Sequence, residues 1–196
     1  MSDRGLSIVG ISGSLRSDSH NSRLLRAAAE LLPPGAELEM AGFGDLPVFS
    51  EDLESDPAPP AVQGFREAIA SADAVVVSTP EYNASIPGGL KNAIDWASRP
   101  FQENPFRGKP VLVIGASTGL FGAVWAQAEV RKVLSHIGAE VVDSELPVGH
   151  AHETVGESGL SEEGLSAELE RQLARLVALA RDPAAERDAA APPVAA

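Results

Sequence analysis

Two unbroken runs of apolar residues restrict the fold of this chain more than any other feature. They read ADAVVVST at 72–79 and PVLVIGAS at 110–117, and a third run, LSIVGI, lies at 6–11. A strand with one face in water alternates polar and apolar side chains, whereas a strand covered on both faces is apolar throughout. These runs therefore predict the central strands of a parallel sheet with helices packed on both faces.

Helical patterns separate the strands, as parallel pairing requires. Helices are predicted at 21–32, 88–98, 130–137 and 161–181. Two further strands, at 36–41 and 139–148, carry Glu37, Glu39 and Glu140 and therefore fit the edges of the sheet. With the apolar runs in the centre, the order is 2-1-3-4-5. The sequence thus predicts a flavodoxin-like three-layer α/β fold, with a five-stranded parallel sheet and helices on both faces.

The length of 196 residues fits one domain with a full hydrophobic core. We expect this domain at 1–181, followed by a disordered tail at 182–196 that consists of Ala, Pro and charged residues. A long irregular segment, Phe43–Pro60, follows the second strand. Long segments of this kind in a compact domain are often functional or lie at a subunit interface.

Composition narrows the classes of function. The formal net charge is −13, which repels nucleic acid phosphates, so no nucleic-acid partner is expected. The sequence has no cysteine, which excludes disulfides, thiol nucleophiles and thiolate metal sites. No apolar run is long enough to cross a bilayer, and the first residues lack the pattern of a signal peptide. We therefore expect a soluble cytoplasmic protein without a membrane partner.

Ligands of this fold class bind at the carboxyl ends of the strands, where the winding direction reverses. The loops after Ile11 and Thr79 should therefore carry the site. The first, SGSLRSDSHNS at 12–22, is rich in hydroxyl groups, contains Arg16 and leads into a helix, all properties of a phosphate-binding loop. A plain helix cap needs only one such side chain. We expect Asp18 to point to solvent. The P-loop and dinucleotide glycine motifs are absent, which favours a mononucleotide.

Three motifs follow one another along the chain: GSLRSDSHN at 13–21, TPEYNASIPGGLKNAIDW at 79–96 and GASTGLFGA at 115–123. In this order and spacing they closely resemble the NADPH-dependent FMN reductase family, which includes quinone, chromate and azo-dye reductases. The resemblance covers Leu6 to Val148. One departure is Ala84, where many relatives have Gly.

The resemblance implies which residues bind FMN. The phosphate would be held by Ser14, Arg16, Ser19, Asn21 and Ser22. The isoalloxazine ring would lie along Pro80, Glu81, Tyr82, Asn83 and Ser85. The loop that approaches the ring edge would supply Ser117, Thr118 and Gly119. Glu81 is also expected to make a structural or inter-subunit hydrogen bond, and Trp96 is expected to be a core or interface aromatic residue.

The implied activity is an NAD(P)H-dependent oxidoreductase reaction. Electrons would pass from NADPH or NADH through bound FMN to a small acceptor such as a quinone, a flavin, chromate or an azo compound. One shared site for both substrates predicts ping-pong kinetics. Because the cofactor carries the chemistry, no catalytic side chain is expected. Members of the family usually form homodimers, and some form homotetramers.

Two other functions fit parts of the sequence. GASTG at 115–119 matches the elbow of a serine hydrolase, with Ser117 as nucleophile, Asp143 as acid and His150 or His152 as base. That alternative leaves the first two motifs unexplained. A non-catalytic FMN electron shuttle would bind the same cofactor without turning over NAD(P)H. His150 and His152 also suggest a metal pair if they lie on a strand, but no third ligand is evident, so no metal site is expected.

Overall fold

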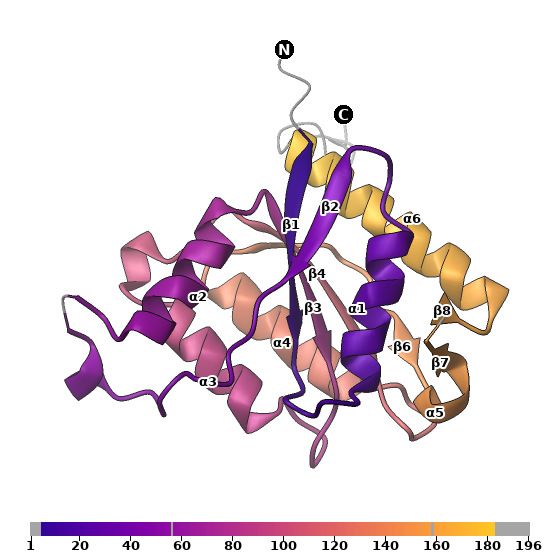
Figure 1. Ribbon diagram of the computed structural model, residues 1–196, viewed down its shortest axis with the longest axis horizontal. Coiled ribbons are helices and arrows are strands. Elements are labelled where there is room, and N and C mark those ends of the chain that lie inside the picture. Colours follow the sequence, from indigo (N-terminus) through magenta and orange to yellow (C-terminus); the bar gives the residue numbers. More distant parts are fainter. Residues whose placement is uncertain (1–4, 56, 158, 183–196) are drawn as a thin grey trace, which may run out of the picture.

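The sheet of the computed structural model is parallel, and its main strands have the order β2-β1-β3-β4-β5 (Figure 1). The structure describes residues 5–55, 57–157 and 159–182. The strands are β1 (Leu6–Ser12), β2 (Ala36–Met40), β3 (Ala74–Thr79), β4 (Pro110–Ala116) and β5 (Glu140–Val141). The predicted flavodoxin-like order 2-1-3-4-5 is confirmed.

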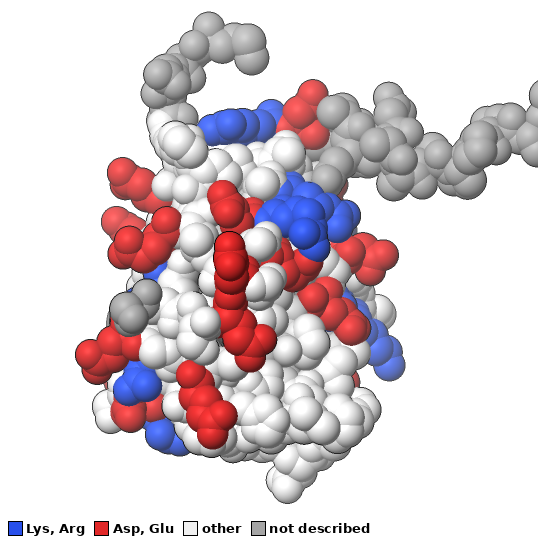
Figure 2. Space-filling view, turned by 90° about the vertical axis from the view of Figure 1, so that its right-hand side faces the viewer, with Lys and Arg blue, Asp and Glu red and all other residues white. Residues whose placement is uncertain are grey.

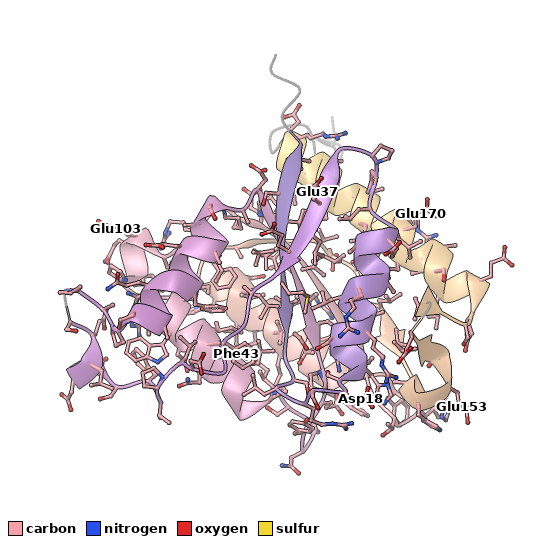
Figure 3. The ribbon with its side chains drawn as sticks, in the orientation of Figure 1. Asp18, Glu37, Phe43, Glu103, Glu153 and Glu170 are labelled. Carbon is pink, nitrogen blue, oxygen red and sulfur yellow. The ribbon has the colours of Figure 1, made fainter. Side chains whose placement is uncertain are left out.

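Burial follows the position of each strand in the sheet. Every residue of β3 and of β4 is buried, as their apolar runs predict. Along β1 the side chains alternate between two cores, with Ile8 in one and Val9 and Ile11 in the other. Glu37 and Glu39 are exposed on the edge strand β2, where Figure 3 labels Glu37. The carboxylates thus lie where the sheet meets water.

Helices cover both faces of the sheet (Figure 1). One face is covered by α1 (His20–Glu30) and α6 (Glu163–Arg181), whose buried leucines, such as Leu24 and Leu173, join the core around Ile8. The other face is covered by α2 (Pro60–Ser71), α3 (Gly88–Ala97) and α4 (Val124–His136). Helix α2 was not predicted, because the irregular segment before it obscured its start.

The predicted last strand at 139–148 is in fact two short strands. The first, β5, ends at Val141, and β6 (Pro147–Val148) pairs with β4 further along. The chain between them leaves the sheet.

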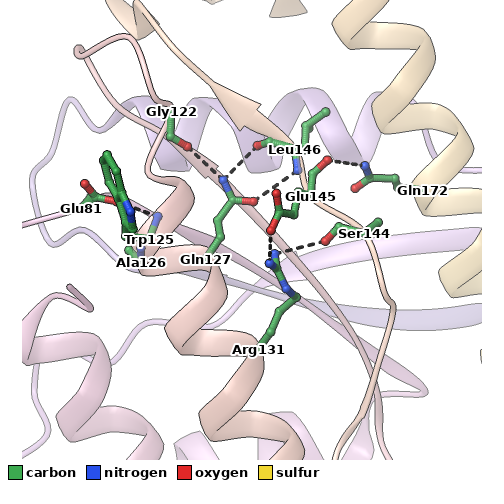
Figure 4. Close-up of polar contacts among 10 residues, drawn as sticks. All are labelled: Glu81, Gly122, Trp125, Ala126, Gln127, Arg131, Ser144, Glu145, Leu146 and Gln172. Carbon is green, nitrogen blue, oxygen red and sulfur yellow. Dashed lines mark hydrogen bonds and ion pairs between the residues drawn. The ribbon is translucent and has the colours of Figure 1, made fainter. Parts of the chain in front are cut away.

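The side chain of Gln127 on α4 fills the gap in that sheet. Its Nε2 donates to the carbonyl oxygens of Gly122 (2.9 Å) and Leu146 (3.2 Å), and its Oε1 accepts from the N–H of Leu146 (3.2 Å) (Figure 4). Gln127 is fully buried. One carboxamide therefore satisfies the buried N–H of Leu146 and shares its carbonyl oxygen with the N–H of Gly115 on β4 (3.3 Å).

The long segment Phe43–Pro60 is fixed to helix α3. Trp96 is fully buried, and its Nε1 donates to the carbonyl oxygen of Pro47 (2.7 Å). Asn92 donates to the same oxygen (3.0 Å) and accepts from the N–H of Phe49 (2.7 Å). Of the two positions expected for Trp96, core or interface, the structure shows the core. The segment contains one short 3₁₀ helix, η1 (Glu51–Leu53).

Several short elements were not predicted: η2 (Phe101–Glu103), α5 (Ala151–Thr154) and the antiparallel pair β7 (Val155–Gly156) and β8 (Gly159–Leu160). Each has two to four residues, too few for a periodic pattern. Helix α6 ends at Arg181, and residues 183–196 of the expected tail lie outside the described residues. In the part of the chain that the structure describes, no helix is long and apolar enough to span a bilayer.

Candidate functional site

A small cavity lies at the carboxyl ends of β1, β3 and β4, where the loops that follow these strands meet. Its volume is about 110 Å³. Most of the predicted site residues line it, and the full lining is Ser14, Arg16, Ser19, His20, Asn21, Pro80, Glu81, Tyr82, Ala116, Ser117 and Thr118. Ser22, Asn83, Ser85 and Gly119 lie outside this lining. Segments about 100 residues apart in sequence are therefore neighbours at one site.

Figure 2 shows that acidic side chains cover much of one side of the molecule, whereas its lower end is mostly uncharged.

The loop after β1 is held by hydroxyl groups. Ser19 caps helix α1, and its side chain accepts from the N–H of Ser22 (3.4 Å). The hydroxyl of Ser22 donates to that of Ser12 (2.9 Å). The hydroxyl of Ser12 in turn contacts the carbonyl oxygen of Ser14 (3.4 Å). Ser19 and Ser22 thus shape the loop through their side chains. The hydroxyl of Ser14, which lines the cavity, also accepts a hydrogen bond within the loop, from the N–H of Arg16 (3.4 Å).

The acid in this loop faces water. The side chain of Asp18 is 66% exposed and forms an ion pair with Arg23 of α1. Figure 3 shows Asp18 at the start of that helix. Arg16 donates from Nη2 to the backbone carbonyl oxygen of Asp18 (3.1 Å). The expectation that Asp18 points to solvent is confirmed, and its charge is partly compensated by Arg23.

Asn21 has a structural role that the sequence did not reveal. It is 2% exposed, and its Nδ2 donates to the carbonyl oxygen of Ala116 (2.9 Å). Its Oδ1 accepts from the N–H of Ala116 (3.0 Å) and from the hydroxyl of Ser78 (2.9 Å). The N–H and C=O of one strand residue point to the same side, so a single carboxamide satisfies both. Asn21 therefore joins α1 to the ends of β3 and β4, and three of the four hydrogen bonds that its carboxamide can make are used within the protein.

The PEYN motif forms a tight hairpin. Tyr82 and Ser85 exchange backbone hydrogen bonds of 3.2 and 3.1 Å. Asn83 and Ala84 between them have φ values of 54° and 58°. Two residues with positive φ in a two-residue hairpin loop are the signature of a type I′ turn, for which Asn-Gly is preferred. Ala84 thus occupies a strained position. Tyr82 is 51% exposed at the mouth of the cavity.

Two carboxylates attach this hairpin to helix α4. The Oε2 of Glu81 accepts from the N–H groups of Trp125 (3.0 Å) and Ala126 (3.1 Å) in the first turn of α4 (Figure 4). These are N–H groups that a helix leaves without partners, and a negative charge there also complements the helix dipole. The structural hydrogen bond expected for Glu81 is confirmed, within one chain. In the other direction, Glu129 on α4 accepts from the hydroxyl of Ser85 (2.6 Å).

Two hydrogen bonds lower the pKa of the Glu129 carboxyl. The larger effect comes from the hydroxyl of Ser85 and the smaller from the N–H of Ile86 (3.2 Å). Ser85 was predicted to lie beside a cofactor, but its hydroxyl is directed to this carboxylate. No sequence signal identifies Glu129 as its partner, because the two residues are 44 positions apart.

The loop after β4 does not have the form of a nucleophile elbow. In that motif the serine lies on a strained turn directly before a helix. Here α4 begins only at Val124, and Ser117 is not among the described residues with positive φ. The hydroxyl of Ser117 contacts the carbonyl oxygen of Gly119 (3.4 Å), and within the described ranges neither His150 nor His152 hydrogen-bonds to it. The geometry thus gives the hydrolase alternative no support.

His150 and His152 do not lie on a strand. His150 has φ 46° and precedes α5, which contains His152. Their ring centroids are 6.4 Å apart, and His152 contacts Glu153 (3.3 Å). Over the residues that the structure describes, no group of three or more His, Cys, Asp or Glu could hold a metal.

Comparisons with known proteins identify the family. Residues 6–153 match the family model of NADPH-dependent FMN reductases. The chain is 52% identical over 134 residues to an NAD(P)H-dependent FMN reductase of Pseudomonas aeruginosa. The aligned region covers 68% of this chain and 71% of the relative. It is 39% identical over 155 residues to a 2-hydroxy-1,4-benzoquinone reductase of a Burkholderia species. This alignment covers 79% of this chain and 84% of the relative.

Solved structures agree with these matches. The flavoenzyme FerB of Paracoccus denitrificans, an NAD(P)H:(acceptor) oxidoreductase, superposes with a TM-score of 0.79 and 35% sequence identity. The superposition covers 90% of this chain and 97% of FerB. The three motifs, the strand order and the shared site thus have one explanation. The chain belongs to the NADPH-dependent FMN reductase family.

Proposed function

We propose that the protein transfers electrons from NADPH or NADH through bound FMN to a small acceptor, by a ping-pong mechanism. The observation that carries this proposal is the convergence of the GSLRSDSHN, PEYN and GAST loops on one cavity. The names of its relatives, FMN reductase, quinone reductase and NAD(P)H:(acceptor) oxidoreductase, support the same reaction class. Quinones, free flavins, chromate and azo compounds are the candidate acceptors.

The residues of the cavity suit a phosphate monoester. Ser14, Arg16 and Ser19 line one space with two hydroxyl groups and a guanidinium. His20 lines it too, and its buried Nδ1 has no partner among the described residues. Charge-assisted hydrogen bonds from arginine to phosphate oxygens are among the strongest in proteins. The first turn of α1 adds partial positive charge. Asn21, by contrast, would act through the loop that it holds in place.

The size of the cavity indicates how the rest of FMN would lie. Sites that enclose drug-sized ligands measure roughly 300–1,000 Å³, and this cavity measures about 110 Å³. Only the phosphate end would therefore be enclosed. The ring would lie along the mouth, between Tyr82 on one loop and Ser117 and Thr118 on another. When bound, FMN supplies the redox chemistry, because its ring accepts a hydride from NAD(P)H and passes on two electrons.

The chain's own residues bind and orient the cofactor. Glu81 already accepts two hydrogen bonds from helix α4, so it positions the PEYN turn and is not a free general base. Asn83 tolerates the positive φ that the tight form of the turn requires, whereas Ala84 adopts it at a steric cost. A ring at an open mouth would offer one face to solvent, where NAD(P)H and the acceptor would bind in turn. That single binding place is the physical basis of the ping-pong proposal.

The surface beside the mouth supports a homodimer or homotetramer. Leu120, Phe121 and Trp125 are 68%, 59% and 48% exposed, and the rings of Phe121 and Trp125 pack edge to face with centroids 5.1 Å apart. Contiguous exposed apolar side chains commonly mark interfaces. Light scattering should therefore report a dimer or tetramer, and a mass equal to one chain would contradict this part of the proposal. Cytoplasmic localisation stays a prediction.

The test of the function begins with the visible spectrum of the purified protein. We expect the bands of oxidised flavin, bleached by NADPH or NADH without oxygen, and turnover with a quinone that gives parallel double-reciprocal lines. A colourless protein that does not bind added FMN and that reacts with a serine-directed phosphonate would favour the serine hydrolase alternative. A protein that binds FMN but does not oxidise NAD(P)H would be the electron shuttle. Intersecting lines would overturn the ping-pong mechanism alone.

The phosphate assignment has its own test. Arg16→Ala should weaken FMN binding, while hydride transfer in the protein refilled with FMN stays near normal. Arg26→Ala removes the same charge from an exposed position further along α1 and serves as the matched control. Equal FMN affinity in the two variants would show that Arg16 does not hold the phosphate.

A further inference from the structure

His20 is a part of the cavity that neither the fold nor the proposed reaction explains. It is the first residue of α1 and lines the cavity together with Ser14, Arg16 and Ser19. Its Nδ1 is buried and has no hydrogen-bond partner among the described residues. Buried polar atoms of side chains nearly always have a partner, and an exception calls for an explanation such as a ligand that supplies one.

The surroundings of the imidazole favour its neutral form. Burial lowers the pKa of His20, and the positive charges of Arg23 and Arg16 lower it further. Asp18 acts in the opposite direction but is exposed and paired with Arg23, and His152 on α5 has a small lowering effect. An ordinary histidine has a pKa of about 6.5. His20 is therefore mostly uncharged at neutral pH when no anion is near.

The acid that also lines the cavity, Glu81, is not among the groups that shift the pKa of His20. Glu81 lines the same cavity, but its carboxylate accepts two N–H groups at the start of α4. The charged and titratable groups that line the cavity are thus the guanidinium of Arg16, the hydrogen-bonded carboxylate of Glu81, the phenol of Tyr82 and the imidazole of His20.

We propose that His20 is a proton-coupled ligand of the FMN phosphate: it is neutral in the empty site, takes up a proton when the phosphate binds, and so makes FMN affinity depend on pH. The inference rests on the proposed function, because it requires FMN in this cavity. No covalent step is involved, and the proton comes from solvent.

The sign of the effect follows from electrostatics. A phosphate monoester carries a charge of about −1.5 to −2 at pH 7, and an anion beside an imidazole favours its charged form. Binding therefore raises the pKa of His20 and takes up protons between the two pKa values. Over that interval the affinity falls as the pH rises, by about tenfold per pH unit at most for one proton. Below about pH 6 the phosphate itself becomes protonated, which opposes the trend; measurements thus belong above about pH 6.5.

The experiment uses the full chain freed of flavin. FMN and riboflavin, which lacks the phosphate, are titrated between about pH 6.5 and 8.5, and the dissociation constants are taken from flavin fluorescence. For the wild type we expect FMN affinity to fall about threefold or more across this range, as a partly coupled proton requires, with little change for riboflavin. His20→Gln should bind FMN with an almost flat profile. His136→Gln, an exposed histidine at the other end of α4, should behave as wild type.

A second measurement keeps the inference testable if His20→Gln folds poorly. Calorimetric titrations of the wild type with FMN in two buffers of different ionisation enthalpy give the number of protons taken up. We expect a clear fraction of a proton with FMN and almost none with riboflavin. A flat FMN profile, no proton uptake, or the same uptake with riboflavin would each overturn the role of His20 and leave the proposed function intact. Failure to bind FMN at every pH would overturn the proposed function itself.

Discussion

The side chain of Asn21 should contribute more to stability than any other polar group at the site, and Asn21→Ala tests this. The substitution removes hydrogen bonds of 2.9, 3.0 and 2.9 Å in a position that is 2% exposed. A typical hydrogen bond contributes about 1 kcal/mol net, and a buried group left without a partner costs roughly 1–3 kcal/mol. The substitution would leave both the N–H and the C=O of Ala116 buried without this partner. We therefore expect a loss of about 3–4 kcal/mol in the free energy of unfolding.

The assay is urea unfolding of the flavin-free protein, followed by circular dichroism. Ser78→Ala is the matched comparison, because it removes only one of the three bonds and leaves both groups of Ala116 paired with Asn21; it should cost about 1 kcal/mol. Asn21→Asp keeps the shape but places a carboxylate against the carbonyl oxygen of Ala116. It should be at least as unstable as Asn21→Ala at neutral pH and should partly recover in acid, where the protonated acid can donate.

The reasoning would be refuted if Asn21→Ala cost less than about 1 kcal/mol, or no more than Ser78→Ala, with an unchanged dependence on urea concentration. Such a result would mean that water or a local shift replaces the carboxamide at little cost. The end of β4 would then not depend on helix α1, and the shape of the cavity would have another origin.

Three further predictions concern the segments around the site. Ala84→Gly should raise the free energy of unfolding by about 1 kcal/mol, because glycine adopts positive φ without the steric penalty of a side chain; a lower urea midpoint would contradict the type I′ turn. Trp96→Phe keeps the ring packing but removes the hydrogen bond to Pro47, so limited proteolysis should cut the segment at 43–60 faster than in wild type, and an equal rate would refute the anchor. The hydrogen bond from Ser85 lowers the pKa of Glu129 in the folded state, so its stabilisation is present above the unfolded pKa and is lost in acid. Glu129→Gln should therefore flatten the pH dependence of stability below about pH 4.5, and an unchanged profile would show that the bond is absent in solution.

The strand order was predictable because burial determines composition. The unbroken apolar runs of β3 and β4 belong in the centre of a sheet, and the acids of β2 belong at its edge, so the pattern alone orders most of the strands. Helix α2 and the division of the last strand were missed for physical reasons. The start of α2 is obscured by proline-rich sequence, and the gap between β5 and β6 is filled by Gln127 on another element, which no local pattern records.

The site was predictable as a place and as a set of loops, but not in the roles of its side chains. Ser14, Arg16 and Tyr82 line the cavity as expected. Asn21 also lines the cavity, but its side chain, like that of Ser85, has partners within the protein, at sequence distances of 95 and 44 residues. A motif states which residue types a family retains. It does not distinguish a residue that contacts the ligand from a residue that only holds the ligand-binding loop in place.

The two buried carboxamides, Asn21 bonded to β4 and Gln127 bonded to Leu146, have one more consequence. Neither Asn21 nor Gln127 has a proton to gain or lose at any pH at which a protein stays folded. The hydrogen bonds of Asn21 and Gln127 are therefore insensitive to acidity, whereas His20, which lines the cavity, can gain a proton. Acidification should change how strongly the site holds an anion without changing its shape, so that occupancy responds to pH while architecture does not.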